Sequence, residues 1–287
     1  MPWLILVSLL WAFSFGLIKT HLSGLDATMV ATVRLALALL VFLPFLRPRK
    51  ISLRPALLLA LIGAVQFGLM YALYMSAFQF LQAHEVALFT IFTPLYITLF
   101  SALRERRLSL RRALATLLAI VGAGLILWRG TSSPQLLQGF FLVQLSNLCF
   151  ALGQLAYKRL RPSIPNPHDA QLFGWLLLGG LLATGTWSFF SSDWAHVSAS
   201  GPQWLVLIYL GTIASGLGFF GWNRGVLQVN AGTLAVFNNL KIPLAVICSL
   251  LFFSARVEAP ERLLASFLLL ADAIWLAESD EEKAAKK

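Results

Sequence analysis

Long runs of apolar residues alternate with short polar, mostly basic segments along nearly the whole chain. A transmembrane helix needs about 20 consecutive apolar residues to cross a hydrocarbon core of about 30 Å. Runs of about that length lie at residues 3–19, 27–46, 55–79, 84–103, 113–128, 136–157, 170–190, 203–226, 232–253 and 262–277. The pattern therefore predicts an all-α membrane protein with ten transmembrane helices, whose short connections leave no room for a separate soluble domain.

The basic residues gather on every second connection. With the N-terminus in the cytoplasm, the inner connections hold twelve Lys and Arg residues and the outer connections hold four. The inner set is Arg47, Arg49, Lys50, Arg54, Arg104, Arg106, Arg107, Arg111, Arg112, Lys158, Arg159 and Arg161, and the outer set is Lys19, Arg129, Arg256 and Arg262. Because cytoplasmic loops are enriched in Lys and Arg, we expect a multi-pass protein of a bacterial-type inner membrane with both termini in the cytoplasm.

Composition agrees with this interpretation and narrows the function. Of 287 residues, 59% are hydrophobic and 12% are charged, whereas soluble domains carry about 25% charged residues. The net charge of +10 comes from clustered loop residues, so we read it as a topology signal and expect no nucleic-acid partner. Cys149 and Cys248 each lie inside an apolar run, where we expect small apolar packing residues.

The second half of the chain partly repeats the first. When the stretch that starts at Gly68 is laid on the stretch that starts at Gly216, Ala83 matches Ala231 and Phe89 matches Phe237. Ten helices divide into two sets of five, and five is odd, so the second set must enter the membrane from the opposite side. Such inverted repeats are typical of alternating-access carriers, whose substrate sites lie near the bilayer midplane. We expect repeats at 1–130 and 131–277, enclosing a central cavity, and a charged cytoplasmic tail at 278–287.

The chain resembles the drug/metabolite transporter superfamily, EamA type. The matching features are Trp11 in the first helix, Arg34 in the second, the pairs Pro94 with Glu105 and Pro243 with Glu258, and the G-x-G of Gly122 and Gly124. Asn223 directly after Trp222 is similar to the branch that exports amino acids and also handles aromatic compounds. Lys241 and Asp272 depart from the family pattern. The resemblance implies two five-helix repeats and transport of a small molecule.

Lys241 is the most unusual of the charged residues. It lies about nine residues inside its apolar run, or roughly 14 Å deep at 1.5 Å per residue. A lysine at that depth costs about 2.5–3.5 kcal/mol on the insertion scale, so it must face protein or water. We predict an ion pair with Asp272 on the last run. The alternative is that Lys241 meets a substrate carboxylate in a hydrated cavity.

Other aromatic and polar residues near the centres of the runs are candidates for the same cavity. The predicted cavity residues are Trp11, Phe15, Tyr71, Tyr74, Thr90, Asn147, Gln154, Trp222, Asn223, Asn238, Asn239 and Lys241. Pro94 and Pro243 are predicted to break their helices and to free the carbonyls of Thr90 and Asn239. Core packing, plain kinks and helix–helix hydrogen bonds are the alternatives. Arg34 is expected to extend to the outer interface.

These features predict a secondary carrier that exports small amphipathic metabolites, with amino acids as the first choice. Efflux of aromatic organic cations or drugs is an alternative, as is a membrane-embedded enzyme or sensor. The chain has no G-x-x-x-x-G-K-[ST] motif for ATP and no H-E-x-x-H motif for a catalytic metal. We therefore expect no enzymatic activity, cofactor or metal. The expected partners are a small-molecule substrate and lipid, with no obligate protein partner.

Overall fold

The computed structural model describes residues 2–22, 24–47, 51–105, 134–165, 168–196, 198–229 and 231–252, with isolated positions between 110 and 121 and between 261 and 276. The described segments are helical and contain no strand. The earlier elements are α1 (Pro2–Leu17), η1 (Ile18–Leu22), α2 (Ala27–Phe42), η2 (Leu43–Phe45), α3 (Leu53–Gly63), η4 (Ala64–Leu69), α4 (Met70–Ala77), α5 (Ala83–Phe89), η5 (Thr90–Phe92) and α6 (Thr93–Glu105). The later ones are α8 (Pro134–Leu160), η6 (Arg161–Ser163), α9 (Asp169–Ser191), η7 (Trp194–His196), α10 (Gly201–Tyr209), η8 (Leu210–Leu217), α11 (Gly218–Val226) and α12 (Ala231–Phe252).

Six of these helical segments are long and apolar enough to cross a membrane, counting only described residues. They run over Pro2–Leu22, Ala27–Phe45, Leu53–Ala77, Gln135–Ser163, Asp169–Ser191 and Gly201–Val226. Each agrees with a predicted run. Helices α5, α6 and α12 also fall on predicted runs. The predicted runs 113–128 and 262–277 fall largely outside the described residues, as does the tail at 278–287, so the count of ten stays a prediction.

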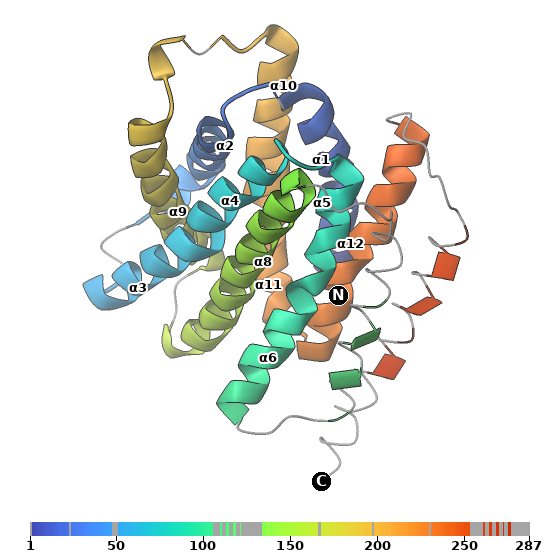
Figure 1. Ribbon diagram of the computed structural model, residues 1–287. Helices are drawn as coiled ribbons and strands as arrows, with labels where there is room; N and C mark the ends of the chain where they lie inside the picture. The colour runs from blue at the N-terminus through green and yellow to red at the C-terminus, as the bar shows by residue number, and fades with distance from the viewer. Residues whose placement is uncertain are drawn as a thin grey trace.

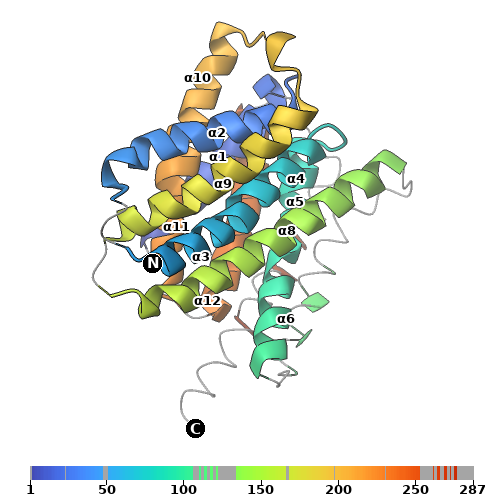
Figure 2. The ribbon, with the colours of Figure 1, turned by 90° about the vertical axis from the view of Figure 1, so that its left-hand side faces the viewer.

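The helices form two layers. In Figure 2 one layer faces the viewer and runs in the order α2, α9, α3 continued by α4, and α8. Helices α1, α11 and α12 lie behind this layer. Figure 1 shows α5 and α6 between α8 and α12. Apolar side chains fill the space between the layers, because each helix buries a stripe such as Leu4 and Val7 on α1 or Leu172 and Leu176 on α9.

Helices α3 and α9 approach each other very closely. A Cβ atom added to Gly63 would lie 1.8 Å from the carbonyl oxygen of Leu176, and one added to Gly179 would lie 1.8 Å from that of Ala60. Only glycine fits at such a contact, as is common where membrane helices pack through small residues. These two glycines therefore fix the distance between α3 and α9.

Two stretches of the chain share an unusual order of elements. Helix α3 begins at residue 53 and passes through the π-helical segment η4 into α4, and α10 begins at residue 201 and passes through the π-helical segment η8 into α11. The two starts differ by 201 − 53 = 148 residues, which is also the offset between Gly68 and Gly216. The order α, π, α thus recurs at the offset of the sequence match.

Polar contacts gather at the two ends of the bundle. At one end, Arg161 Nε donates to Asp169 Oδ1 at 2.9 Å, and Gln171 donates to the carbonyl of Arg47 at 2.8 Å. At the other end, Gln203 donates to the carbonyl of His21 at 3.0 Å, and Lys19 donates to that of Phe78 at 3.0 Å. The structure thus groups the predicted inner connections at one end and the predicted outer connections at the other, and cytoplasmic termini stay a prediction.

Candidate functional site

A cavity opens between the two layers of helices. It encloses about 560 Å³ of space free of atoms, part of it open to solvent. The lining residues come from both halves of the chain and are Trp11, Ser14, Phe15, Ile18, Arg34, Met70, Tyr71, Tyr74, Thr90, Thr93, Ser146, Asn147, Phe150, Phe219 and Lys241.

Arg34 on α2 is one of two cations in this lining. Its side chain is 2% exposed, so the expectation that it extends to the outer interface is wrong. One terminal nitrogen donates to the Tyr71 hydroxyl at 2.8 Å and to Ser215 Oγ at 3.2 Å, and the guanidinium carbon lies 4.5 Å from the centre of the Tyr71 ring. These neutral partners hold the guanidinium at the cavity wall, while its buried Nε has no hydrogen-bond partner among the described residues.

Lys241 on α12 is the second cation. It is 7% exposed, and its Nζ lies 5.4 Å from the centre of the Trp11 ring and 5.8 Å from that of Phe150. Both distances allow a cation–π interaction, which acts within about 6 Å. The aromatic walls therefore give the ammonium partial stabilisation without a counter-ion.

The predicted ion pair between Lys241 and Asp272 is not formed in the described part of the chain. Asp272 is exposed, whereas Lys241 is buried at the cavity. A buried ammonium and an exposed carboxylate do not share an environment, so the expected pairing fails because the two residues lie in different surroundings.

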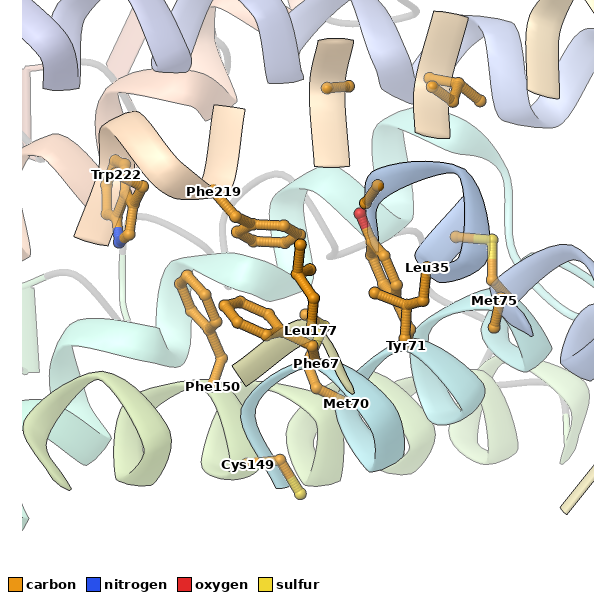
Figure 3. Close-up of a cluster of buried hydrophobic side chains, with 14 of the residues drawn as sticks. Leu35, Phe67, Met70, Tyr71, Met75, Cys149, Phe150, Leu177, Phe219 and Trp222 are labelled. Atoms are coloured by element: carbon orange, nitrogen blue, oxygen red, sulfur yellow. The ribbon is translucent and has the colours of Figure 1, made fainter. Parts of the chain in front are cut away.

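Aromatic rings form one wall of the cavity. The Trp11 ring lies 4.9 Å from Phe219 and 6.1 Å from Phe150, measured between ring centres, and its Nε1 donates to the carbonyl of Ala214 in η8 at 3.0 Å. Figure 3 shows Phe150 from α8 close to Phe219 and Trp222, which both come from α11. The Trp11 hydrogen bond ties α1 to the π-helical segment of the other half.

A change of helix type lies directly before Pro94. Thr90–Phe92 is a 3-10 segment, and α6 begins at Thr93. The carbonyl of Thr90, which Pro94 leaves without its helical partner, accepts a hydrogen bond from the Thr93 hydroxyl at 2.8 Å. Helix α12, in contrast, continues from Ala231 to Phe252, so position 243 does not divide it; a proline removes one backbone donor, and the neighbouring hydrogen bonds can sustain the helix.

Asn147 on α8 both lines the cavity and joins two helices. Its Nδ2 donates to the carbonyl of Phe89 at 2.9 Å and to Gln144 Oε1 at 3.2 Å. Gln144 Nε2 donates to the same Phe89 carbonyl at 3.2 Å. The polar face of α8 therefore repairs the interrupted hydrogen bonding of the α5–η5 junction, as the helix–helix alternative anticipated.

Seven of the twelve predicted cavity residues line the cavity, namely Trp11, Phe15, Tyr71, Tyr74, Thr90, Asn147 and Lys241. The remaining five are buried outside its lining. Trp222 Nε1 donates to Gln154 Oε1 at 3.2 Å, Gln66 donates to Asn223 Oδ1 at 3.0 Å, and Asn238 donates to the carbonyl of Leu234 at 3.0 Å. Asn239 is 5% exposed, and its Oδ1 has no hydrogen-bond partner among the described residues.

Sequence reasoning missed several lining residues, of which Arg34, Thr93 and Phe219 matter most. An arginine about seven residues inside an apolar run is itself a signal, because such residues face the interior of a bundle more often than lipid. Thr93 lies at the position equivalent to Lys241 at the same offset, since 241 − 93 = 148. Phe219 is likewise 148 residues after Tyr71. The repeat could therefore have identified two of the three.

The charges of the cavity indicate what it can bind. Arg34 and Lys241 are both cationic, and no Asp or Glu is among the lining residues that the structure describes. No group of three or more metal-ligating His, Cys, Asp or Glu side chains occurs in the described part of the chain. An anionic group would compensate the two cations, and the aromatic walls would pack against an apolar body.

Comparisons with known proteins find similar chains that are described as transporters. A chain described as a biotin transporter from Salmonella typhimurium is 40% identical over 280 residues, covering 96% of this chain and 92% of the relative. One from Escherichia coli K12 is 40% identical over 279 residues, with the same coverage. A probable biotin transporter from Pseudomonas aeruginosa is 39% identical and covers 96% of each chain. These descriptions do not support the amino-acid substrate expected from the sequence.

The fold has a counterpart among solved structures. A crystal structure whose description names no function shares 17% identity, has a TM-score of 0.72 and covers 95% of this chain and 96% of its own. The model of the EamA-like transporter family matches residues 1–128 and 137–276 of this chain. The chain is therefore a membrane protein that belongs to the EamA-like transporter family of the drug/metabolite transporter superfamily.

Proposed function

We propose that this protein is a secondary carrier of biotin, which it binds in the cavity between Arg34 and Lys241. The observation that carries the proposal is the pair of buried cations without an acidic residue among the described lining residues. Biotin has one carboxylate, an apolar chain and ring, and a neutral ureido group. The names of the relatives point to the same molecule.

The cavity complements each part of this substrate. The carboxylate compensates Lys241 or Arg34 through charge-assisted hydrogen bonds. The hydrocarbon chain and the sulfur-containing ring pack against Trp11, Phe150 and Phe219, which bring large apolar surfaces to the cavity. Hydroxyls of Ser14, Thr93 and Ser146 supply polar contacts to groups that reach the wall.

An amino acid fits this lining less well. Its carboxylate would meet the same cations, but its ammonium would need a compensating anion, and the described lining offers none. An aromatic organic cation fits worse, because Arg34 and Lys241 would repel it. Both alternatives therefore serve as competitors in the experiment below, and export as the direction stays a prediction.

We infer alternating access between two inverted halves as the mechanism. The recurrence of the α, π, α order at an offset of 148 residues supports two related halves. Residues from both halves line one cavity, as with Tyr71 and Phe219. A cavity between two related halves is the arrangement from which carriers expose a site to either face of the membrane in turn.

The test is flux of radiolabelled biotin into proteoliposomes that contain the purified protein. We expect saturable flux that unlabelled biotin inhibits. Biotin methyl ester lacks the carboxylate charge and should inhibit this flux at least tenfold more weakly than biotin does. Amino acids and quaternary amines are added at the same concentrations and should not compete. Absence of biotin flux, or equal inhibition by the ester, would contradict the proposal.

A further inference from the structure

Four buried polar side chains form a second group of polar residues outside the cavity lining. They are Gln66 of η4, Gln154 of α8, and Trp222 and Asn223 of α11, and we call them the amide cluster. Each is at most 2% exposed. Gln66 Nε2 donates to Asn223 Oδ1 at 3.0 Å, and Trp222 Nε1 donates to Gln154 Oε1 at 3.2 Å. A Cβ atom on Gly153 would lie 2.2 Å from Gln66 Cβ, so Gln66 packs directly against α8 beside Gln154.

On each of three helical segments, a residue of the amide cluster lies about one helical turn from a residue that lines the cavity. Gln66 precedes the lining residue Met70 by four residues, Gln154 follows Phe150 by four, and Asn223 follows Phe219 by four. Four residues correspond to about 6 Å along an α-helix. The cluster is displaced toward the end of the bundle where α8 and α11 end and α3 begins, which is the predicted cytoplasmic end.

Aromatic rings separate the two sites. Trp222 stands 4.8 Å from Trp11 and 6.3 Å from Phe150, measured between ring centres, and Trp11 and Phe150 both line the cavity. Figure 3 shows Trp222 beyond Phe150 and Phe219 in the same group of rings. The amide groups of the cluster therefore lie on the far side of these rings from the cavity.

The hydrogen bonding of the cluster is incomplete. Gln154 Nε2 and Asn223 Nδ2 are buried donors, and Gln66 Oε1 is a buried acceptor, and none of the three has a hydrogen-bond partner among the described residues. Each unpaired buried group costs about 1–3 kcal/mol, so three in one place call for a functional explanation.

The three unpaired groups have the hydrogen-bonding pattern that a ureido group requires. A ureido carbonyl accepts two hydrogen bonds, and its N–H groups donate. We propose that the amide cluster is a second substrate subsite, in which Gln154 and Asn223 donate to the ureido carbonyl and Gln66 accepts from a ureido N–H. This inference rests on the proposed transport of biotin.

Occupation of the subsite has a mechanical consequence. The hydrogen bond from Gln66 to Asn223 joins the segment η4 of the first half to α11 of the second. A ureido group bound through the unpaired Gln66 Oε1 and Asn223 Nδ2 would leave this bond in place and add a second link between the same two segments. Occupation of the subsite would therefore hold the two segments together more firmly at that end of the bundle.

The experiment compares biotin with lipoate, which has the same pentanoate carboxylate and a sulfur ring but no ureido group. Proteoliposome flux of both compounds is measured for the wild type and for Gln154→Met and Asn223→Leu, which remove the amides at similar volume. We expect the wild type to prefer biotin and each variant to lose about fivefold to tenfold of that preference, the effect of one hydrogen bond of about 1 kcal/mol. Lipoate flux should change little.

Matched variants separate recognition from folding. Gln171→Met removes a buried amide of α9 that bonds to the carbonyl of Arg47, and it should leave the preference for biotin unchanged. Gln154→Asn and Asn223→Gln keep the amide chemistry and should retain part of the preference. Thermal unfolding of each purified variant reports whether it folds.

The outcomes distinguish this inference from the proposed function. Absence of biotin flux in the wild type contradicts the proposed function itself. The subsite alone is overturned if the wild type transports biotin without preferring it to lipoate. It is also overturned if the Gln154→Met and Asn223→Leu variants fold and keep the full preference for biotin. An equal loss of biotin and lipoate flux in these variants also overturns it, because a purely structural role predicts that result.

Discussion

At the scale of single residues, Arg34 and Lys241 are the two cations in the described lining of the cavity. Both are buried, and both are held by neutral groups: Arg34 by the Tyr71 hydroxyl and Ser215, Lys241 by the Trp11 and Phe150 rings. Neutral partners orient a cation without cancelling its charge, so the charge is left for an anion to compensate. In the proposed function, Tyr71 and Ser215 are therefore positioning residues, and the two cations are the binding groups.

Removal of the Lys241 charge should weaken substrate binding. We expect Lys241→Met to raise the KM for biotin flux by about 10- to 100-fold, because hydrogen bonds to charged groups contribute about 1.5–3 kcal/mol. Lys241→Arg should retain more activity than Lys241→Met. Arg54→Met, which removes an exposed charge at the start of α3, is the control and should leave KM unchanged. Equal KM values for Lys241→Met and the wild type would contradict the assignment.

At the scale of elements, two features hold α9 against the neighbouring helices α2 and α3. Asp26 caps α2 by accepting from the Met29 N–H at 2.8 Å, and it also accepts from Thr28 and Ser192, so it ties the start of α2 to the end of α9. Gly63 and Gly179 bring α3 and α9 into backbone contact. Helix α9 thus holds α2 through a polar cap and α3 through close packing.

The Asp26 cap predicts a loss of stability in acid. Partial burial raises the pKa of Asp26, but hydrogen bonds from Ser192, from the Met29 N–H and from Thr28 outweigh it, so that the pKa lies below the usual value of 3.8. Because the folded state has the lower pKa, the stabilisation is complete above about pH 3.8 and is lost as the pH falls through the folded pKa. The Asp26→Asn variant should have a lower unfolding temperature than the wild type at pH 6. The difference in unfolding temperature between the two proteins should be smaller at pH 3. A constant difference across this range would contradict the role of the carboxylate.

The α3–α9 contact predicts that a single methyl group at Gly179 is destabilising. We expect Gly179→Ala to lower the free energy of unfolding by about 1–3 kcal/mol, the usual cost of overpacking. Gly185→Ala on the same helix is the control, because the nearest atom to its added Cβ would be Thr32 Cγ2 at 4.0 Å. Thermal or denaturant unfolding in detergent measures both, and equal stabilities would show that the helices can separate without cost.

At the scale of the whole molecule, the structure places the cavity between two ends that each carry a group of polar contacts. Arg47, Arg161 and Asp169 meet at one end, and His21, Asp26 and Ser192 gather at the other. The distribution of Lys and Arg predicts that the first of these ends faces the cytoplasm.

Cysteine labelling tests this orientation. In a variant whose native Cys149 and Cys248 are replaced by Ala, Ser192→Cys should react with a membrane-impermeant maleimide in intact cells. Arg54→Cys should react only after the membrane is permeabilised. The opposite pattern would place the N-terminus outside, and labelling of both positions in intact cells would require a repeat with a sealed-vesicle control.

Periodicity and charge were enough to predict the helical membrane fold, because each span must satisfy its backbone within one apolar run. The central position of Lys241 was also predictable from its depth. Three other findings depend on tertiary packing. Arg34 turns inward because Tyr71 and Ser215 receive it, Asp272 does not pair because its environment is exposed, and η4 and η8 adopt π-helical hydrogen bonding within sequences that also suit an α-helix.

In the proposed function, the two cations of the cavity would also make transport sensitive to membrane voltage. Arginine side chains are cations, so the cavity without substrate holds positive charge, and a bound monocarboxylate would reduce that charge by one. A unit charge that crosses the full membrane field gains or loses about 2.3 kcal/mol per 100 mV. In the proposed function, the loaded and the substrate-free protein would therefore respond differently to an electrical gradient, and the resting potential of a cell would enter the transport cycle through Arg34.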